Sequence, residues 1–71
     1  MWIGSKEALA IAEADAVKEY PDLTGYQIWL SLESDGWHVD YELKDPTTKG
    51  GGPHYVIDAV TGAVLSKRYE W

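Results

Sequence analysis

The chain has 71 residues, with 12 acidic side chains against six basic ones and a formal net charge of −6. This length allows one domain, and the absence of cysteine excludes disulfides and thiolate metal sites, so a core rich in Trp and Tyr must supply the stability. The acidic balance excludes nucleic-acid or anionic-membrane binding through clustered Lys and Arg.

The same charge balance is typical of an ordinary soluble protein, or of one with a basic partner. No run of apolar residues reaches the roughly 20 that a membrane span needs. The N-terminus also lacks the basic, apolar and small-residue order of a signal peptide. We expect either a cytoplasmic protein or a mature domain whose signal lies outside this sequence.

The first predicted element is a helix from Lys6 to about Tyr20. Ser5 is a good N-cap, and Glu7 in the first turn suits the helix dipole. The segment is rich in Ala, Leu, Glu and Lys, and Pro21 ends it because a residue before proline disfavours helical geometry. Its apolar face is broad and mostly small, which favours packing on a sheet. The stripe contains Leu9, Ala12, Ala16 and Tyr20, with Val17 beside it, Glu13 near it, and Ala8 and Ile11 on the opposite shoulder.

Two strands follow, joined by a short turn. Residues 26–32 alternate between apolar and other side chains, and Glu33-Ser34-Asp35-Gly36 is a hairpin turn of the Asp-Gly type. From Trp37 to Lys44 every second residue is apolar and every residue between is polar. This pattern predicts an antiparallel strand with one buried and one solvated face.

The rest of the chain predicts a second hairpin. A polar, Gly-rich loop from Asp45 to Pro53 precedes a third strand at residues 55–59 and a fourth from Ala63 to about Tyr69. Asp58 and Thr61 can hydrogen-bond to local amides, and Gly62 can adopt the positive φ that a short turn demands. We therefore predict one α+β domain over residues 1–71, with an N-terminal helix packed on a four-stranded antiparallel meander.

Two sequence patterns are candidates for a binding or catalytic site. Lys49-Gly50-Gly51-Gly52 does not match a phosphate loop, because the lysine precedes the glycines and a strand follows them. We interpret this segment as an adaptable loop, with partner contact as the alternative. Polar residues alternate on the second and third strands and lie on one surface if those strands pair. They are His38, Asp40, Glu42, His54 and Asp58.

A solvated sheet face explains these polar residues better than a metal or catalytic site does. Two His and several carboxylates are acceptable ligands for a divalent cation, but the nine-residue loop leaves the strand register open. A meander offers no obvious water-excluding cleft, and no serine has a nucleophile-elbow context. We predict no catalytic residue, no metal, no cofactor and no enzyme activity.

Aromatic residues are the remaining candidates for binding. Trp29 is out of phase with the apolar residues of its strand and is predicted to point outward, where Trp and Tyr are common anchors for partners. The alternatives are that both sheet faces are partly covered, or that Trp2 and Trp71 clasp the termini together. Scattered exposed aromatics are common on protein surfaces.

Three motifs give the chain a resemblance to the PepSY-like domains of bacteria. Ser5-Lys6-Glu7-Ala8 opens the helix, Trp37-His38-Val39 lies in a strand, and Asp58-Ala59-Val60-Thr61-Gly62-Ala63-Val64 closes the final hairpin. The resemblance spans nearly the whole chain and implies a helix packed on an antiparallel sheet. It also implies a non-enzymatic role, as a protease-inhibitory, chaperone-like or binding domain, and a secreted or cell-envelope location.

The chain is also similar to small immunity proteins with a nuclear-transport-factor-like fold. That similarity rests on Gly51-Gly52, Tyr55, Ile57-Asp58 and Thr61-Gly62. A full domain of that kind has several helices, whereas this chain predicts one. Neither resemblance carries a catalytic or ligand residue.

We therefore predict a non-catalytic protein-binding module, monomeric or weakly dimeric, with a protease or a basic toxin as partner and no nucleic acid or membrane. The alternatives are an immunity protein that neutralises a toxin, or a domain excised from a secreted protease precursor. The predicted contact residues are Trp29, His38, Asp40, Lys49, Gly50, Gly51, Gly52 and His54.

Overall fold

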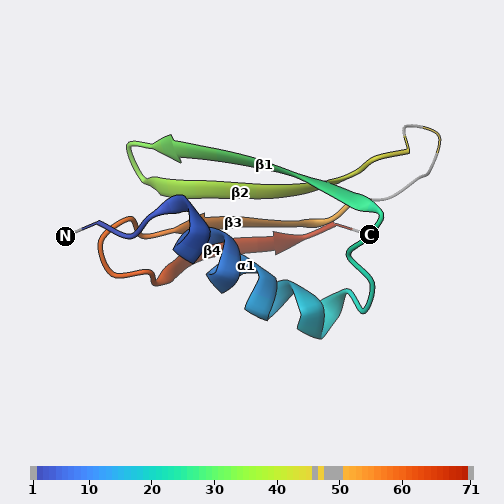
Figure 1. Cartoon of the computed structure of the whole chain (residues 1–71), viewed down its shortest axis with the longest axis horizontal. Coiled ribbons are helices and arrows are strands. Elements are labelled where there is room, and N and C mark those ends of the chain that lie inside the picture. Colours follow the sequence, from blue (N-terminus) through green and yellow to red (C-terminus); the bar gives the residue numbers. More distant parts are fainter. Residues whose placement is uncertain (1, 46, 48–50, 71) are drawn as a thin grey trace.

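The computed structural model describes residues 2–45, 47 and 51–70. In that part of the chain one helix, α1 (Ser5–Glu19), precedes the strands β1 (Tyr26–Glu33), β2 (Gly36–Leu43), β3 (Pro53–Ile57) and β4 (Val64–Tyr69). The strands pair in chain order as an antiparallel sheet, and α1 crosses one face of it (Figure 1). The predicted two-layer α+β meander is confirmed.

The helix begins one residue earlier than its sequence indicates. Gly4 is the N-cap in an extended conformation, and the Glu7 carboxylate accepts a hydrogen bond from the Gly4 amide at 3.3 Å. The prediction of Ser5 as the cap is wrong, because the Glu7 side chain reaches back one residue further. At the other end Tyr20 is extended (φ −123°, ψ 102°) before Pro21, so the predicted stop is confirmed.

The buried side of α1 is a row of small residues spaced four apart. Ala8, Ala12 and Ala16 are fully buried, and Tyr20 continues the row at 4% exposure. Ala8 was wrongly placed on the opposite shoulder, and Val17, placed beside the stripe, is 51% exposed. The reason is the position of α1, which packs over β2 and β3 and turns Val17 away from both.

The sheet register aligns the apolar residues of neighbouring strands. Val39 of β2 lies opposite Tyr55 of β3 on one side and Leu30 of β1 on the other. Val39, Tyr41, Tyr55 and Ile57 form the buried core with the alanines of α1. The third strand starts at Pro53 and ends at Ile57, two residues earlier at each end than predicted, and the fourth starts at Val64.

The closing hairpin has the predicted turn chemistry. Asp58 Oδ1 accepts hydrogen bonds from the amides of Val60 and Thr61, at 2.7 and 2.9 Å. Gly62 has a φ of 79°, the left-handed conformation that glycine adopts without strain. The Asp58 amide donates to the carbonyl of Ala63 at 2.8 Å. Asp58 therefore serves the turn and does not join the polar residues of the sheet.

Candidate functional site

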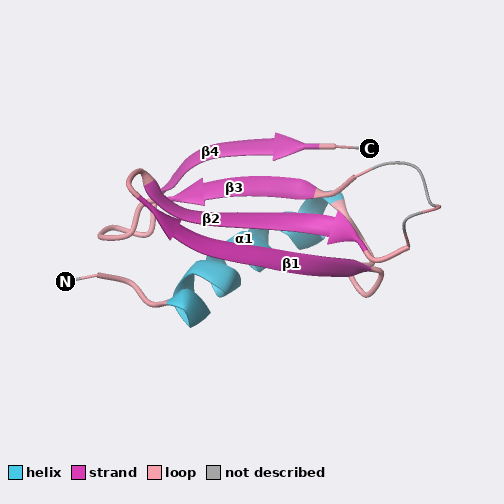
Figure 2. Cartoon of the chain, turned by 90° about the horizontal axis from the view of Figure 1, so that it is seen from above, coloured by secondary structure: helices cyan, strands magenta, loops and turns pink. Residues whose placement is uncertain are grey.

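The sheet face opposite α1 is not covered by any element in the part of the chain that the structure describes (Figure 2). Strand alternation directs polar side chains of all four strands to this side. We call it the open face and define it by Trp29, His38, Asp40, Glu42, His54 and Arg68. The pairing of β2 with β3 thus puts the polar residues of both strands on one surface, as the sequence suggested.

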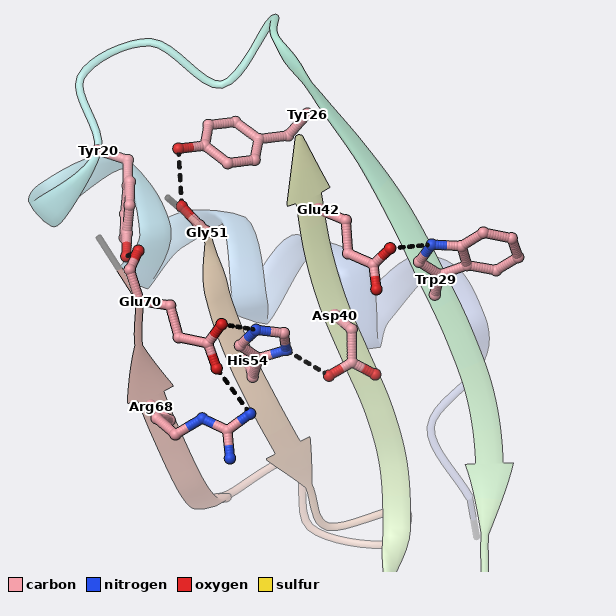
Figure 3. A network of polar contacts seen from close by, with 9 residues as sticks. All are labelled: Tyr20, Tyr26, Trp29, Asp40, Glu42, Gly51, His54, Arg68 and Glu70. Atoms are coloured by element: carbon pink, nitrogen blue, oxygen red, sulfur yellow. Dashed lines mark hydrogen bonds and ion pairs between the residues drawn. The ribbon is translucent and has the colours of Figure 1, made fainter. Parts of the chain in front are cut away.

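His54 lies at the middle of a charged row that crosses three strands. It is directly opposite Asp40 on β2, and its Nδ1 lies 2.7 Å from Asp40 Oδ1. Its Nε2 lies 3.5 Å from Glu70 Oε1, and the other Glu70 oxygen pairs with Arg68 at 2.9 Å (Figure 3). The His54 side chain is 18% exposed. Both ring nitrogens therefore face carboxylate oxygens.

His38 does not join this row. Its Nε2 lies 2.6 Å from Asp35 Oδ1, within the turn between β1 and β2. This hydrogen bond raises the pKa of His38 above its ordinary value of 6.5 and lowers the pKa of Asp35. Because the folded-state pKa of His38 is raised, the contact stabilises the turn below pH 6.5 and is lost as the pH rises through the folded-state value.

Trp29 is the large apolar side chain of the open face. It projects from the outer strand β1, as predicted, and is 58% exposed. Its indole Nε1 donates a hydrogen bond to Glu42 Oε2 at 3.0 Å, so an aromatic surface lies beside a carboxylate (Figure 3). The alternative was that both sheet faces are partly covered, and among the described elements none covers this side. Trp71 of the other alternative lies outside the described residues, and Trp2 is 66% exposed.

Of the glycine stretch, the described residues include Gly51 and Gly52. Lys49 and Gly50 lie outside the described residues. The Gly51 carbonyl accepts a hydrogen bond from the Tyr26 hydroxyl at 3.1 Å, and Gly52 is buried. A Cβ at position 52 would lie 2.7 Å from the Tyr41 carbonyl oxygen. A Cβ at position 51 would instead lie 2.7 Å from Cβ of Glu70. Packing against Tyr26 and Tyr41 therefore explains Gly52 and packing against Glu70 explains Gly51, and their contact with a partner stays a prediction.

The sequence reasoning missed several polar contacts of the open face. Glu42 was recognised as polar but not as the partner of Trp29, and Arg68 and Glu70 were not considered. Their signal was the alternation of β4, in which Ser66 and Arg68 share the face of His54 and Glu70 follows directly after the strand. The alternation alone could not show that these residues lie beside His54, because that depends on the register of β3 with β4.

A second polar cluster lies on the helix side and was also missed. Asp15 of α1 accepts hydrogen bonds from the hydroxyls of Tyr69 (2.5 Å) and Tyr55 (2.9 Å) and from Lys67 Nζ (3.2 Å). These contacts, that of Tyr69 first, lower the pKa of Asp15, while burial and Asp15 raise the pKa of Tyr55 well above its ordinary value. The available signal was a carboxylate next to Ala16 on the buried side of the helix.

No group of three His, Asp or Glu side chains is placed to hold a metal ion among residues 2–45, 47 and 51–70. The helix in this part of the chain is not long and apolar enough to cross a bilayer. Comparison with family models, curated proteins and solved structures finds no match.

Proposed function

We propose that this protein is a non-catalytic module that binds a second protein through the open face of its sheet. The observation that carries the proposal is the exposure of Trp29 beside the Glu42 carboxylate on a face that no described element covers. Tryptophan is enriched among the residues that dominate binding energy, because its rigid ring buries a large area with few rotatable bonds.

The chemistry of the face indicates a basic partner. Asp40, Glu42 and Glu70 place carboxylates around the row, and the Arg68 side chain is already paired with Glu70. An arginine of a partner would stack on the Trp29 ring and pair with Glu42. The net charge of −6 would also attract a basic protein from a distance and speed its association.

The geometry around His54 supports a role without catalysis. A general base needs a ring nitrogen that reaches a substrate proton. Here Nδ1 of His54 contacts Asp40 and Nε2 faces Glu70, so the imidazole already has a carboxylate at each nitrogen. The row is better suited to holding three strands and their charges in fixed positions.

The two resemblances suggest two classes of partner, a protease and a basic toxin. The PepSY-like resemblance implies a helix over an antiparallel sheet, and the structure has this arrangement. The agreement supports a protease as the partner, which the module inhibits or helps to fold. That protease includes one from whose precursor the domain is excised. The acidic face equally fits a basic toxin neutralised by an immunity protein. A neighbouring protease sequence or a neighbouring toxin gene distinguishes them, as does the activity that the purified protein inhibits.

The test is affinity capture from the native host with four matched baits, the wild-type protein and three variants. Wild-type protein and Val60→Ala, which shortens an exposed residue in the β3–β4 connection, are expected to capture the same partner. Trp29→Ala is expected to lose it, and Glu42→Gln to bind it more weakly. Because the contact is electrostatic, raising the salt concentration should release the partner.

Each bait is first shown to be folded by circular dichroism. The captured protein is then purified and titrated against each variant, so that affinity and not yield is compared. Equal affinity of folded Trp29→Ala and wild type for that protein would contradict the proposal, and so would affinity that does not change with salt.

A further inference from the structure

The outer strand β1 presents an unpaired backbone edge. It is the first strand in the sheet order and pairs only with β2 within the described residues. The Lys44 amide donates to the Gly25 carbonyl at 3.0 Å, which fixes the alternation of the ladder: odd-numbered residues of β1 bond to β2. Ile28, Leu30 and Leu32 therefore direct their amides and carbonyls away from the sheet.

This edge lacks the features that usually prevent strand pairing. Natural edges carry Lys, Pro or bulges. Over its eight residues, roughly 27 Å, β1 has none of these and one charge, Glu33, at its end. The opposite edge has them: β4 contains Lys67 and Arg68, and its register with β3 shifts at Val56/Ile57. The two edges of one sheet thus differ in protection.

The side chains of β1 next to the helix are also incompletely covered. Ile28 is 44% and Leu32 50% exposed, although both share the face of the core. Ile28 borders an open groove of about 350 Å³ between β1 and α1, which Val17 and Leu23 also line. Exposed backbone and exposed apolar side chains therefore occur together along one edge.

We propose that β1 pairs antiparallel with β1 of a second copy of this chain, so that the two sheets form one continuous sheet. A two-fold axis perpendicular to the sheet puts both helices on the same side of the joined sheet. Side chains that lie opposite each other across the seam therefore belong to the same face. The amides and carbonyls of Ile28, Leu30 and Leu32 point away from the sheet, and one register pairs these three residues with those of the second copy. That register is centred on Leu30. It sets Leu30 opposite Leu30 and Ile28 opposite Leu32 of the second copy.

The side chains of this register are self-complementary. The two half-exposed residues Ile28 and Leu32 cover each other. On the open face Trp29 meets the small Ser31, and Glu33 meets the amide of Gln27 instead of a second carboxylate. No like charges face each other along the seam, so the net charge of −6 does not oppose pairing at this edge.

The assembly closes at two copies. A further copy would have to add at β4, where the bulge and the cations Lys67 and Arg68 disfavour pairing. A two-fold dimer with an isologous seam is therefore expected and an open filament is not. This inference does not depend on the proposed function, although the dimer would place two open faces side by side.

The first experiment is a charge exchange at the seam. Wild-type protein in sedimentation equilibrium should show a mass that rises with concentration from 7.9 kDa towards twice that value. The double variants Ile28→Lys/Leu32→Lys and Ile28→Glu/Leu32→Glu should each raise the dimer dissociation constant at least about tenfold, through like-charge repulsion. An equimolar mixture should restore the dimer, because each Lys then faces a Glu. The control Leu65→Lys, on an exposed residue of β4, should dimerise like wild type.

The second experiment alters the backbone and leaves the side chains intact, so it does not depend on the charged variants folding. A chemically prepared chain with an N-methyl group on Leu30 loses a seam donor and should be monomeric. The same group on Lys67, whose amide faces outward on β4, should leave the dimer intact.

Three results would overturn the inference. The first is a wild-type chain that stays monomeric at millimolar concentration. The second is a folded charge-exchange mixture that fails to restore the dimer, which would assign the contact to another register or to the strand of a different protein. The third is equal loss of dimer from N-methylation at Leu30 and at Lys67.

Discussion

Asp15 joins the two layers of the molecule through a single carboxylate. It accepts hydrogen bonds from Tyr55 on β3 and Tyr69 on β4, and it pairs with Lys67. Both tyrosine hydroxyls donate to Oδ2 of Asp15 and the Lys67 ammonium donates to Oδ1. An asparagine whose carbonyl oxygen faces the tyrosines would therefore turn its NH2 group, which only donates, toward Lys67, and the negative charge would be lost. The sequence offered no motif for this cluster, because Asp15 is at least 40 residues along the chain from each of its three partners.

We therefore predict that Asp15→Asn lowers the free energy of unfolding by about 1–3 kcal/mol at neutral pH. The contacts lower the folded-state pKa of Asp15 below 3.8, so its contribution is present above 3.8 and is lost as the pH falls through the folded-state value. Urea unfolding of both proteins at neutral pH and well below 3.8 should show the difference shrink in acid. Glu13→Gln, an exposed carboxylate on the same helix, is the control. A difference that is constant with pH would contradict this assignment.

Val39 tests which face of the sheet is buried. It is fully buried between Leu30 and Tyr55, so the carboxylate of Val39→Asp would be desolvated without a cation. That cost is comparable to the roughly 4–10 kcal/mol of total stability expected for a domain of this size. We predict an unfolded protein by circular dichroism and near-wild-type melting for Val60→Asp, the same change on a valine that is 54% exposed. A folded Val39→Asp protein with unchanged melting temperature would mean that the sheet phase is wrong.

At the scale of elements, the first residue of β2 lies against the backbone at the end of β3. Gly36 has a φ of 133°, and a Cβ there would lie 2.4 Å from the Ile57 carbonyl oxygen of β3. The backbone fixes the position of the Cβ, and the atom that it meets is a backbone oxygen, so no rotamer change relieves the clash. Gly36 is therefore required by the pairing of β2 with β3 and not only by the turn.

We predict that Gly36→Ala destabilises the domain by about 3 kcal/mol or more, through backbone strain and overpacking. Gly25→Ala is the matched control, since a Cβ at Gly25 meets no atom within 4 Å. Thermal melting of both variants measures the effect. Equal melting temperatures for the two would show that β3 does not approach this turn.

At the scale of the whole molecule, the distance between the layers depends on the alanine row of α1. Ala8, Ala12 and Ala16 have no exposed surface, so the helix backbone lies close to β2 and β3. The consequence is that α1 covers the middle of the sheet and leaves the β1 side chains partly exposed. The same packing that makes the core thus leaves apolar side chains exposed along the β1 edge.

Ala12→Leu should accordingly lower the free energy of unfolding by about 1–3 kcal/mol, because three added carbons enter a filled interface. Ala10→Leu, on the exposed side of the same helix, should change it by less than about 0.5 kcal/mol. Chemical denaturation of the two variants measures the difference. A stabilised Ala12→Leu protein would indicate that the layers are further apart than described.

The sequence by itself determined the elements and, in the strands, which residues share a face. The alternation of β2, the proline after α1 and the turn at Asp58 and Gly62 act between residues close in the chain, where local geometry decides. Trp29 was placed on the correct face for the same reason. The helix cap and the strand ends shifted by one or two residues, because side chains such as Glu7 choose between neighbouring partners.

Only the tertiary structure decided what lies beside what. The register across the loop between β2 and β3 could not be read locally, and a slip of one residue would move every side chain to the other face. It brought His54 to Asp40, and the next pairing brought Glu70 and Arg68 to His54. The position of α1 set Asp15 against two tyrosines and left Ile28 and Leu32 of β1 partly exposed. These are interactions between distant segments, which form only when the whole core packs.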